Sequence, residues 1–151
     1  MKRILCFALS AGLWLAMAHT AGAQMIANKK LSASDLGAAQ SEARSAGGKD
    51  AQLIYATRLD AVEKGKFDSL VVIYAKGKDT NALIVRAGKR YLLKADPSGQ
   101  SVKAGDQFQR MGVRYEEGKA PVLRFFSVGD GGGLHSVDYR YNWLEFVVEG
   151  Q

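Results

Sequence analysis

The stretch LHSVDYRYNWLEFVVE, residues 134–149, decides the fold class, because apolar and aromatic side chains occupy every second position of its first half. An extended chain sends alternate side chains to opposite faces, so this two-residue period predicts a β-strand with one dry and one solvated face. The row on the dry face consists of His135, Val137, Tyr139, Tyr141 and Trp143.

After Trp143 the alternation changes phase, because Leu144, Phe146 and Val148 are apolar in the opposite register. One extra residue must be absorbed there, so we expect a β-bulge or a turn at residues 142–144. The segment is also long enough to bend or to form two strands.

Six further apolar runs rich in Val, Ile, Leu, Tyr and Phe lie upstream, separated by short segments that contain Gly, Asp, Asn or Pro. Short turns between such runs are typical of antiparallel neighbours. The sequence therefore predicts a mainly β fold, an antiparallel meander that forms a small β-barrel or a β-sandwich. The runs cover residues 52–59, 69–76, 81–87, 90–95, 108–116 and 122–128.

The amino-terminal segment has the pattern of a secretory signal. Lys2 and Arg3 precede an apolar run over residues 4–17, and the small residues of the Ala21-Gly22-Ala23 step suit a signal peptidase. We expect residues 1–23 to be a cleavable signal peptide, which predicts a periplasmic or secreted protein with no transmembrane segment after cleavage. Cys6 is the one cysteine and lies in this segment, so no disulfide is expected.

Residues 24–50 are rich in Ala, Ser, Gly, Lys and Gln, which predicts a flexible leader or a short helix with Ser34 as N-cap and Gly47 as stop. The apolar face of that helix would be mostly alanine. We expect it to be weakly held and to lie outside the main core. The antiparallel β domain is predicted for residues 51–151.

The chain carries a formal net charge of +6, and loss of Lys2 and Arg3 with the signal would leave 6 − 2 = +4. A mild positive excess favours anionic neighbours, so the expected partner is an unknown protein or an envelope polyanion, and not a nucleic acid. A cationic track interleaved with Tyr74 and Tyr91 is one candidate surface. Its members are Lys76, Lys78, Arg86, Lys89, Arg90 and Lys94.

The aromatic row has two interpretations. It is either the inner wall of a sheet, where large rings stabilise a core, or a binding platform, because Tyr and Trp are the favoured anchors of recognition surfaces and of sugar-stacking sites. The candidate ligand-binding residues under the second interpretation are His135, Tyr139, Arg140, Tyr141 and Trp143.

Catalytic machinery is not expected. His135 is the one histidine outside the signal, and Ser136 and Asp138 leave the strand on the opposite side from it, so no triad forms. No metal-ligand spacing and no cofactor motif is present. The chemistry that stays open is a hydrolase that works through carboxylates on a cell-wall or glycan substrate. Its candidates are Glu116, Glu117, Asp138 and Glu145.

The stretch DAVEKGKFDSLVV, which begins at Asp60, resembles the calcium loop of FG-GAP propeller repeats, with Gly65 and Asp68 also at matching places. The two intervening ligand positions hold Val62 and Lys64. An aliphatic side chain and a cation cannot bind calcium, so we expect no metal here.

These features together predict an exported, non-enzymatic binding or interaction module of the bacterial cell envelope, with an unknown ligand. The alternative is the carboxylate-dependent hydrolase of cell-wall or glycan substrates.

Overall fold

The structure is a computed structural model that describes residues 31–93, 107–129 and 131–149. The expected signal peptide lies outside these residues. Within them, no helix is both long enough and apolar enough to cross a bilayer. The elements are α1 (Ala33–Gly47), β1 (Gln52–Leu59), β2 (Ser69–Lys76), β3 (Asp79–Arg86), β4 (Lys89–Leu92), β5 (Gln107–Arg114), β6 (Val122–Val128), β7 (Leu134–Tyr141) and β8 (Phe146–Val148).

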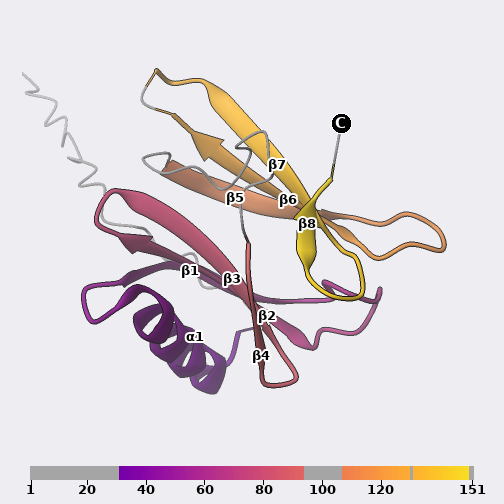
Figure 1. Cartoon of the computed structure of the whole chain (residues 1–151), viewed down its shortest axis with the longest axis horizontal. Coiled ribbons are helices and arrows are strands. Elements are labelled where there is room, and N and C mark those ends of the chain that lie inside the picture. Colours follow the sequence, from indigo (N-terminus) through magenta and orange to yellow (C-terminus); the bar gives the residue numbers. More distant parts are fainter. Residues whose placement is uncertain (1–30, 94–106, 130, 150–151) are drawn as a thin grey trace, which may run out of the picture.

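The strands form two four-stranded antiparallel sheets, ordered β1-β2-β3-β4 and β5-β6-β7-β8. The sheets stack face to face and do not close on each other, and α1 covers the outer face of the first sheet (Figure 1). The predicted mainly β, sandwich-like meander is confirmed, and the barrel alternative is wrong. The molecule therefore has three layers, a helix and two sheets.

Ring contacts join the sheets at both edges. The ring centroids of Tyr55 in β1 and Phe108 in β5 are 5.2 Å apart, and those of Tyr91 in β4 and Phe146 in β8 are 5.7 Å apart. Strand β1 thus lies over β5, and β4 lies over β8.

Four loops meet at one end of the sandwich, which we call the loop end (Figure 1). In a meander, the loops that follow alternate strands share one end of the sheet. A hydrogen bond between the loop after β1 and the loop after β5 shows that both sheets direct these loops to the same end. The loop end consists of residues 60–68, 87–88, 115–121 and 142–145.

Strand β2 is the central element of the fold, because both of its faces are covered. Val71 and Ile73 point into the core between the two sheets, whereas Val72 and Tyr74 point toward α1. A strand that is buried on both faces needs a continuous apolar run, and SLVVIYAK supplies one.

The helix begins two residues earlier than predicted, because Ser32 and not Ser34 is the N-cap. The Ser32 hydroxyl accepts a hydrogen bond from the Asp35 N–H at 3.0 Å, and the Asp35 carboxylate accepts one from the Ser32 N–H at 3.4 Å. This reciprocal capping box satisfies two backbone donors that a cap at Ser34 would leave unpaired.

The helix lies outside the core between the two sheets, as expected, but it packs closely on the first sheet. Ala39, Ala43 and Gly47 are buried against the first sheet and form a second core with β1, β2 and β3. A Cβ at Gly47 would lie 2.7 Å from the ring of Tyr74, so the absence of a side chain allows the close approach. The small residues that suggested a loose helix are the ones that let it dock.

The predicted phase change after Trp143 is confirmed as a turn. It divides the last apolar run into β7 and β8, which pair through Tyr141 and Phe146.

Candidate functional site

The aromatic row is divided between the core and the solvent. Tyr139 is fully buried and packs edge to face on Phe125, with ring centroids 5.7 Å apart. Tyr141 is half-buried, whereas His135 and Trp143 are exposed at opposite ends of β7. The middle of the row is therefore the inner wall of the sheet, and Tyr139 is not available to a ligand. The structure brings Tyr141 and Trp143 together and leaves His135 at the far end.

Trp143 forms the tip of the turn between β7 and β8, where its side chain is 85% exposed and that of Leu144 is 77% exposed. Its backbone has φ = +75°, a conformation that favours glycine. The Asn142 Oδ1 accepts hydrogen bonds from the N–H groups of Leu144 and Glu145 at 3.0 and 2.9 Å, and the Tyr141 hydroxyl donates to the Trp143 carbonyl at 2.9 Å. The turn thus fixes a large apolar ring in solvent.

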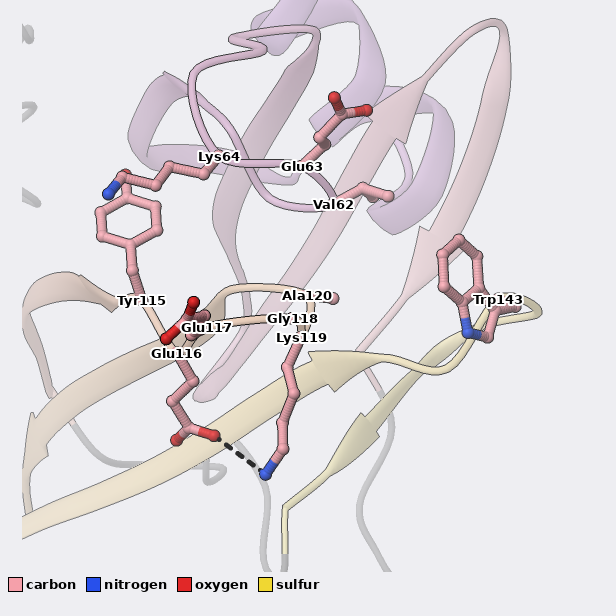
Figure 2. A pocket seen from close by; sticks show the side chains of 10 residues that line it. All are labelled: Val62, Glu63, Lys64, Tyr115, Glu116, Glu117, Gly118, Lys119, Ala120 and Trp143. Atoms are coloured by element: carbon pink, nitrogen blue, oxygen red, sulfur yellow. Dashed lines mark ion pairs between the residues drawn. The ribbon is translucent and has the colours of Figure 1, made fainter.

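A cavity of about 680 Å³ lies beside this ring at the loop end. It is lined by the loop between β1 and β2, by the loop between β5 and β6, and by Trp143. Figure 2 shows Lys64 and Tyr115 together on one side of the cavity, and Trp143 standing alone on the other. The volume lies within the range of ligand-binding pockets, about 300–1,000 Å³.

Asp60 ties the two lining loops together. Its carboxylate is 2% exposed and accepts hydrogen bonds from the Gly65 N–H and from the Tyr115 hydroxyl, each at 2.7 Å. Burial, followed by the hydrogen bond to Asp60, raises the pKa of Tyr115 to about 12, so this hydroxyl stays protonated and donates at neutral pH. Lys64 Nζ lies 5.3 Å from the centroid of the Tyr115 ring. The aspartate that resembles a calcium ligand therefore accepts from N–H and O–H donors.

Arg140 lies on the outer face of the second sheet and holds the loop between β5 and β6, which lines the cavity. It donates to the Ala120 carbonyl at 2.6 Å, to Glu116 at 2.8 Å and to Glu149 at 2.5 Å. The hydrogen bond from Arg140, and then that from Lys119, holds the pKa of Glu116 below its ordinary value. Arg140 thus positions the loop between β5 and β6, and its donors are turned toward protein acceptors.

The candidate catalytic carboxylates divide into two groups. Asp138 accepts two hydrogen bonds from Arg124, at 2.7 and 2.6 Å, and Glu116 is held by Arg140. A glycosidase acid needs a raised pKa, and the pKa of Glu116 is shifted the other way. Glu117 and Glu145 are exposed in loops. In the part of the chain that the structure describes, no three His, Cys, Asp or Glu side chains lie where they could hold a metal ion.

The cationic track is not continuous. Lys76 and Lys78 lie at the turn between β2 and β3, at the opposite end from Arg86 and Arg90. Arg86 is paired with Asp68 and Arg90 with Glu42. Tyr74 is buried beneath α1, and Lys94 lies outside the described residues.

Most of the residues that line the cavity were not among the candidates predicted from the sequence. Val62 and Lys64 lie in one loop, Tyr115 and Lys119 lie in another that is distant in sequence, and none of the four belongs to the aromatic row. The predicted meander places the loop after β5 and the turn after β7 at one end of the second sheet, and the stacking of the sheets adds the loop after β1.

Comparisons with protein families, with curated proteins and with solved structures found no match to this chain.

Proposed function

We propose that the protein is an exported, non-enzymatic binding module of the bacterial cell envelope, and that it holds its partner at the loop end with Trp143 as the central anchor. The partner is an envelope protein or an envelope polymer. The amino-terminal signal pattern supports export to the periplasm or the medium.

One observation carries this proposal: a tryptophan that is 85% exposed occupies a positive-φ position at the tip of a turn. Folding alone favours glycine at such a backbone position and places a large apolar ring in the core. Strained backbone that displays an anchor residue is typical of functional surfaces, where the surrounding structure stabilises the strain. The cavity beside the ring supplies the concave surface that a partner needs.

Binding is favoured over hydrolysis because the carboxylates with fixed positions already have partners. Glu116 and Asp138 accept from arginines, which keeps both engaged in the outer face of the second sheet. Amide replacement of the exposed Glu145, which is not part of the cavity lining, is expected to leave binding within twofold of the parent, and the same replacement at the cavity residue Glu117 removes a second exposed carboxylate. Loss of a measurable turnover in either variant would instead favour the hydrolase.

Co-sedimentation with isolated envelope fragments tests the proposal. The retained fraction of the parent chain is measured against fragment concentration, together with that of Trp143→Ala. Leu134→Ala is the matched control, because Leu134 is also a large apolar residue, is 64% exposed, and lies at the other end of β7.

We expect Trp143→Ala to weaken retention by about tenfold or more, as for a central anchor, and Leu134→Ala to behave like the parent. Equal retention of all three chains would show that the loop end is not the binding surface.

A further inference from the structure

The charges around the loop-end cavity restrict the class of ligand. Three glutamates, Glu63, Glu116 and Glu117, and two lysines, Lys64 and Lys119, are among the residues that line the cavity. Positive and negative side chains are both present around the cavity, and their charges almost cancel. A polyanion would meet the carboxylates and a polycation would meet the lysines, so long-range attraction favours neither.

A hydroxyl group suits both kinds of charge, because it donates to a carboxylate and accepts from an ammonium group. Several of the charged groups already have protein partners. Glu116 accepts from Arg140 at 2.8 Å and pairs with Lys119 at 3.3 Å. Glu63 pairs with Lys66 at 2.7 Å. Paired groups keep unused lone pairs and N–H bonds at fixed positions. The lining thus offers hydrogen bonds to a neutral ligand without the need to neutralise a net charge.

The lining has an aromatic ring on each side, Trp143 on one and Tyr115 on the other, with small residues between them. Trp143 faces the loop that carries Gly118 and Ala120, and Val62 points into the same space (Figure 2). The indole ring is oriented by an edge contact with Tyr141, at 6.4 Å between centroids, and by the hydrogen bonds of the turn. A rigid indole face can cover the C–H face of a pyranose ring, whose hydroxyls then point toward the polar loops.

We propose that the loop-end cavity binds a neutral sugar chain, with the indole of Trp143 stacked on one ring and the carboxylates and lysines of the two loops hydrogen-bonded to its hydroxyls. This inference rests on the proposed binding function and names its ligand class.

Calorimetric titration of the full chain with defined oligosaccharides tests the inference. The neutral probes are tetrasaccharides of β-1,4-linked glucose and of β-1,4-linked N-acetylglucosamine, and the anionic probe is a heparin tetrasaccharide. The variants are Trp143→Ala, Trp143→Tyr, which keeps an aromatic face, and the control Leu134→Ala. A thermal unfolding transition shows that each variant is folded.

We expect a neutral tetrasaccharide to bind the parent and Leu134→Ala equally, Trp143→Ala to bind it about tenfold or more weakly, and Trp143→Tyr to lie between. Binding of the heparin probe alone overturns the inference in favour of a polyanion. The inference is also overturned if no saccharide binds but Trp143→Ala still loses co-sedimentation. In that case the proposed binding function stands, and the partner is a protein. If no saccharide binds and co-sedimentation is also insensitive to Trp143, the inference and the proposed function both fail.

Discussion

Trp143 combines two features that folding alone does not favour, an exposed ring and a left-handed backbone. The side chain contributes little packing, since its ring contact is with Tyr141 at 6.4 Å, yet its Cβ opposes φ = +75°. A non-glycine residue in this region costs about 1–2 kcal/mol. Trp143 therefore lowers the stability of the folded protein relative to a glycine at the same position.

Trp143→Gly is expected to raise the free energy of unfolding by about 1 kcal/mol, because glycine adopts a positive φ without strain. The same variant is expected to lose binding to envelope fragments. Trp143→Ala is the control, since it removes the ring but keeps the Cβ. Urea unfolding of the three chains measures the difference, and equal or lower stability of the glycine variant would contradict the strain assignment.

Tyr115→Phe tests the hydrogen bond that joins the two cavity loops. Removal of the hydroxyl leaves the buried Asp60 with one donor fewer, which is expected to cost about 1–3 kcal/mol. The folded pKa of Tyr115, about 12, lies above its ordinary 10.0, so the parent loses this contribution as pH rises from 10 to 12. Unfolding measured against pH checks both effects, and a variant as stable as the parent at pH 7 would show that the bond contributes nothing.

At the scale of elements, the docking of α1 depends on its small residues. Gly47 sits against Tyr74 and Ala51, and a Cβ there would lie 2.7 Å from an atom of each. Gly37 is in the same helix, but a Cβ there would meet nothing within 4 Å. Substitution of Gly37 therefore changes helix propensity alone, whereas substitution of Gly47 also changes the packing of the helix on the sheet.

Gly47→Ala is expected to destabilise the protein by about 1–3 kcal/mol, because the helix must move off the sheet. Gly37→Ala, at an exposed helical position, is expected to stabilise it by up to about 1 kcal/mol. Thermal unfolding of both variants provides the comparison. Similar shifts in the two variants would mean that the close approach at Tyr74 is not maintained in solution.

Strand positions and the final turn could be predicted because they depend on local periodicity. The apolar run at residues 69–76 matches β2 to the residue, and the change of phase after Trp143 marks the turn before β8. The docking of α1 could not be predicted, because alanine and glycine signal nothing until the opposing surface is known. The predicted N-cap at Ser34 is wrong for a local reason, because the Asp35 carboxylate accepts a hydrogen bond from the Ser32 N–H and so fixes the cap at Ser32.

The candidate site could be predicted only in part, because much of it depends on contacts between segments that are distant in sequence. Trp143 and Tyr141 could be found from the aromatic row, but the row does not show that Tyr139 is buried and Trp143 is not. Arg140 could be found from the same strand, on its solvated face, whereas its partners Glu116 and Glu149 come from other segments. Residues that meet only through sheet topology leave no periodic signal.

At the scale of the whole molecule, ion pairs on both outer surfaces connect stability to pH. Asp35 is bonded to Arg58, which joins α1 to β1, and Glu116 is bonded to Arg140 on the second sheet. These contacts lower the pKa of Asp35 from 3.8 and that of Glu116 from 4.5. A carboxyl with a depressed folded pKa stabilises the protein above its unfolded pKa, and the contribution is lost as pH falls through the folded value.

We therefore expect stability to fall as pH drops below about 4.5, the ordinary value for Glu116. Glu116→Gln should be less stable than the parent at pH 7, and the difference should shrink toward low pH. Glu117→Gln is the matched control, as the same change on a neighbouring exposed carboxylate. A difference between parent and Glu116→Gln that does not depend on pH would contradict the ion-pair assignment.

We propose that the sandwich presents Trp143 to a partner at its loop end. Acrylamide quenching of tryptophan emission, in a chain with Trp14→Phe so that Trp143 alone reports, tests it most directly. We expect red-shifted, readily quenched emission from the protein alone, and blue-shifted, protected emission when envelope fragments are added. Blue-shifted, protected emission from the protein alone, or no change on addition of the fragments, would contradict it.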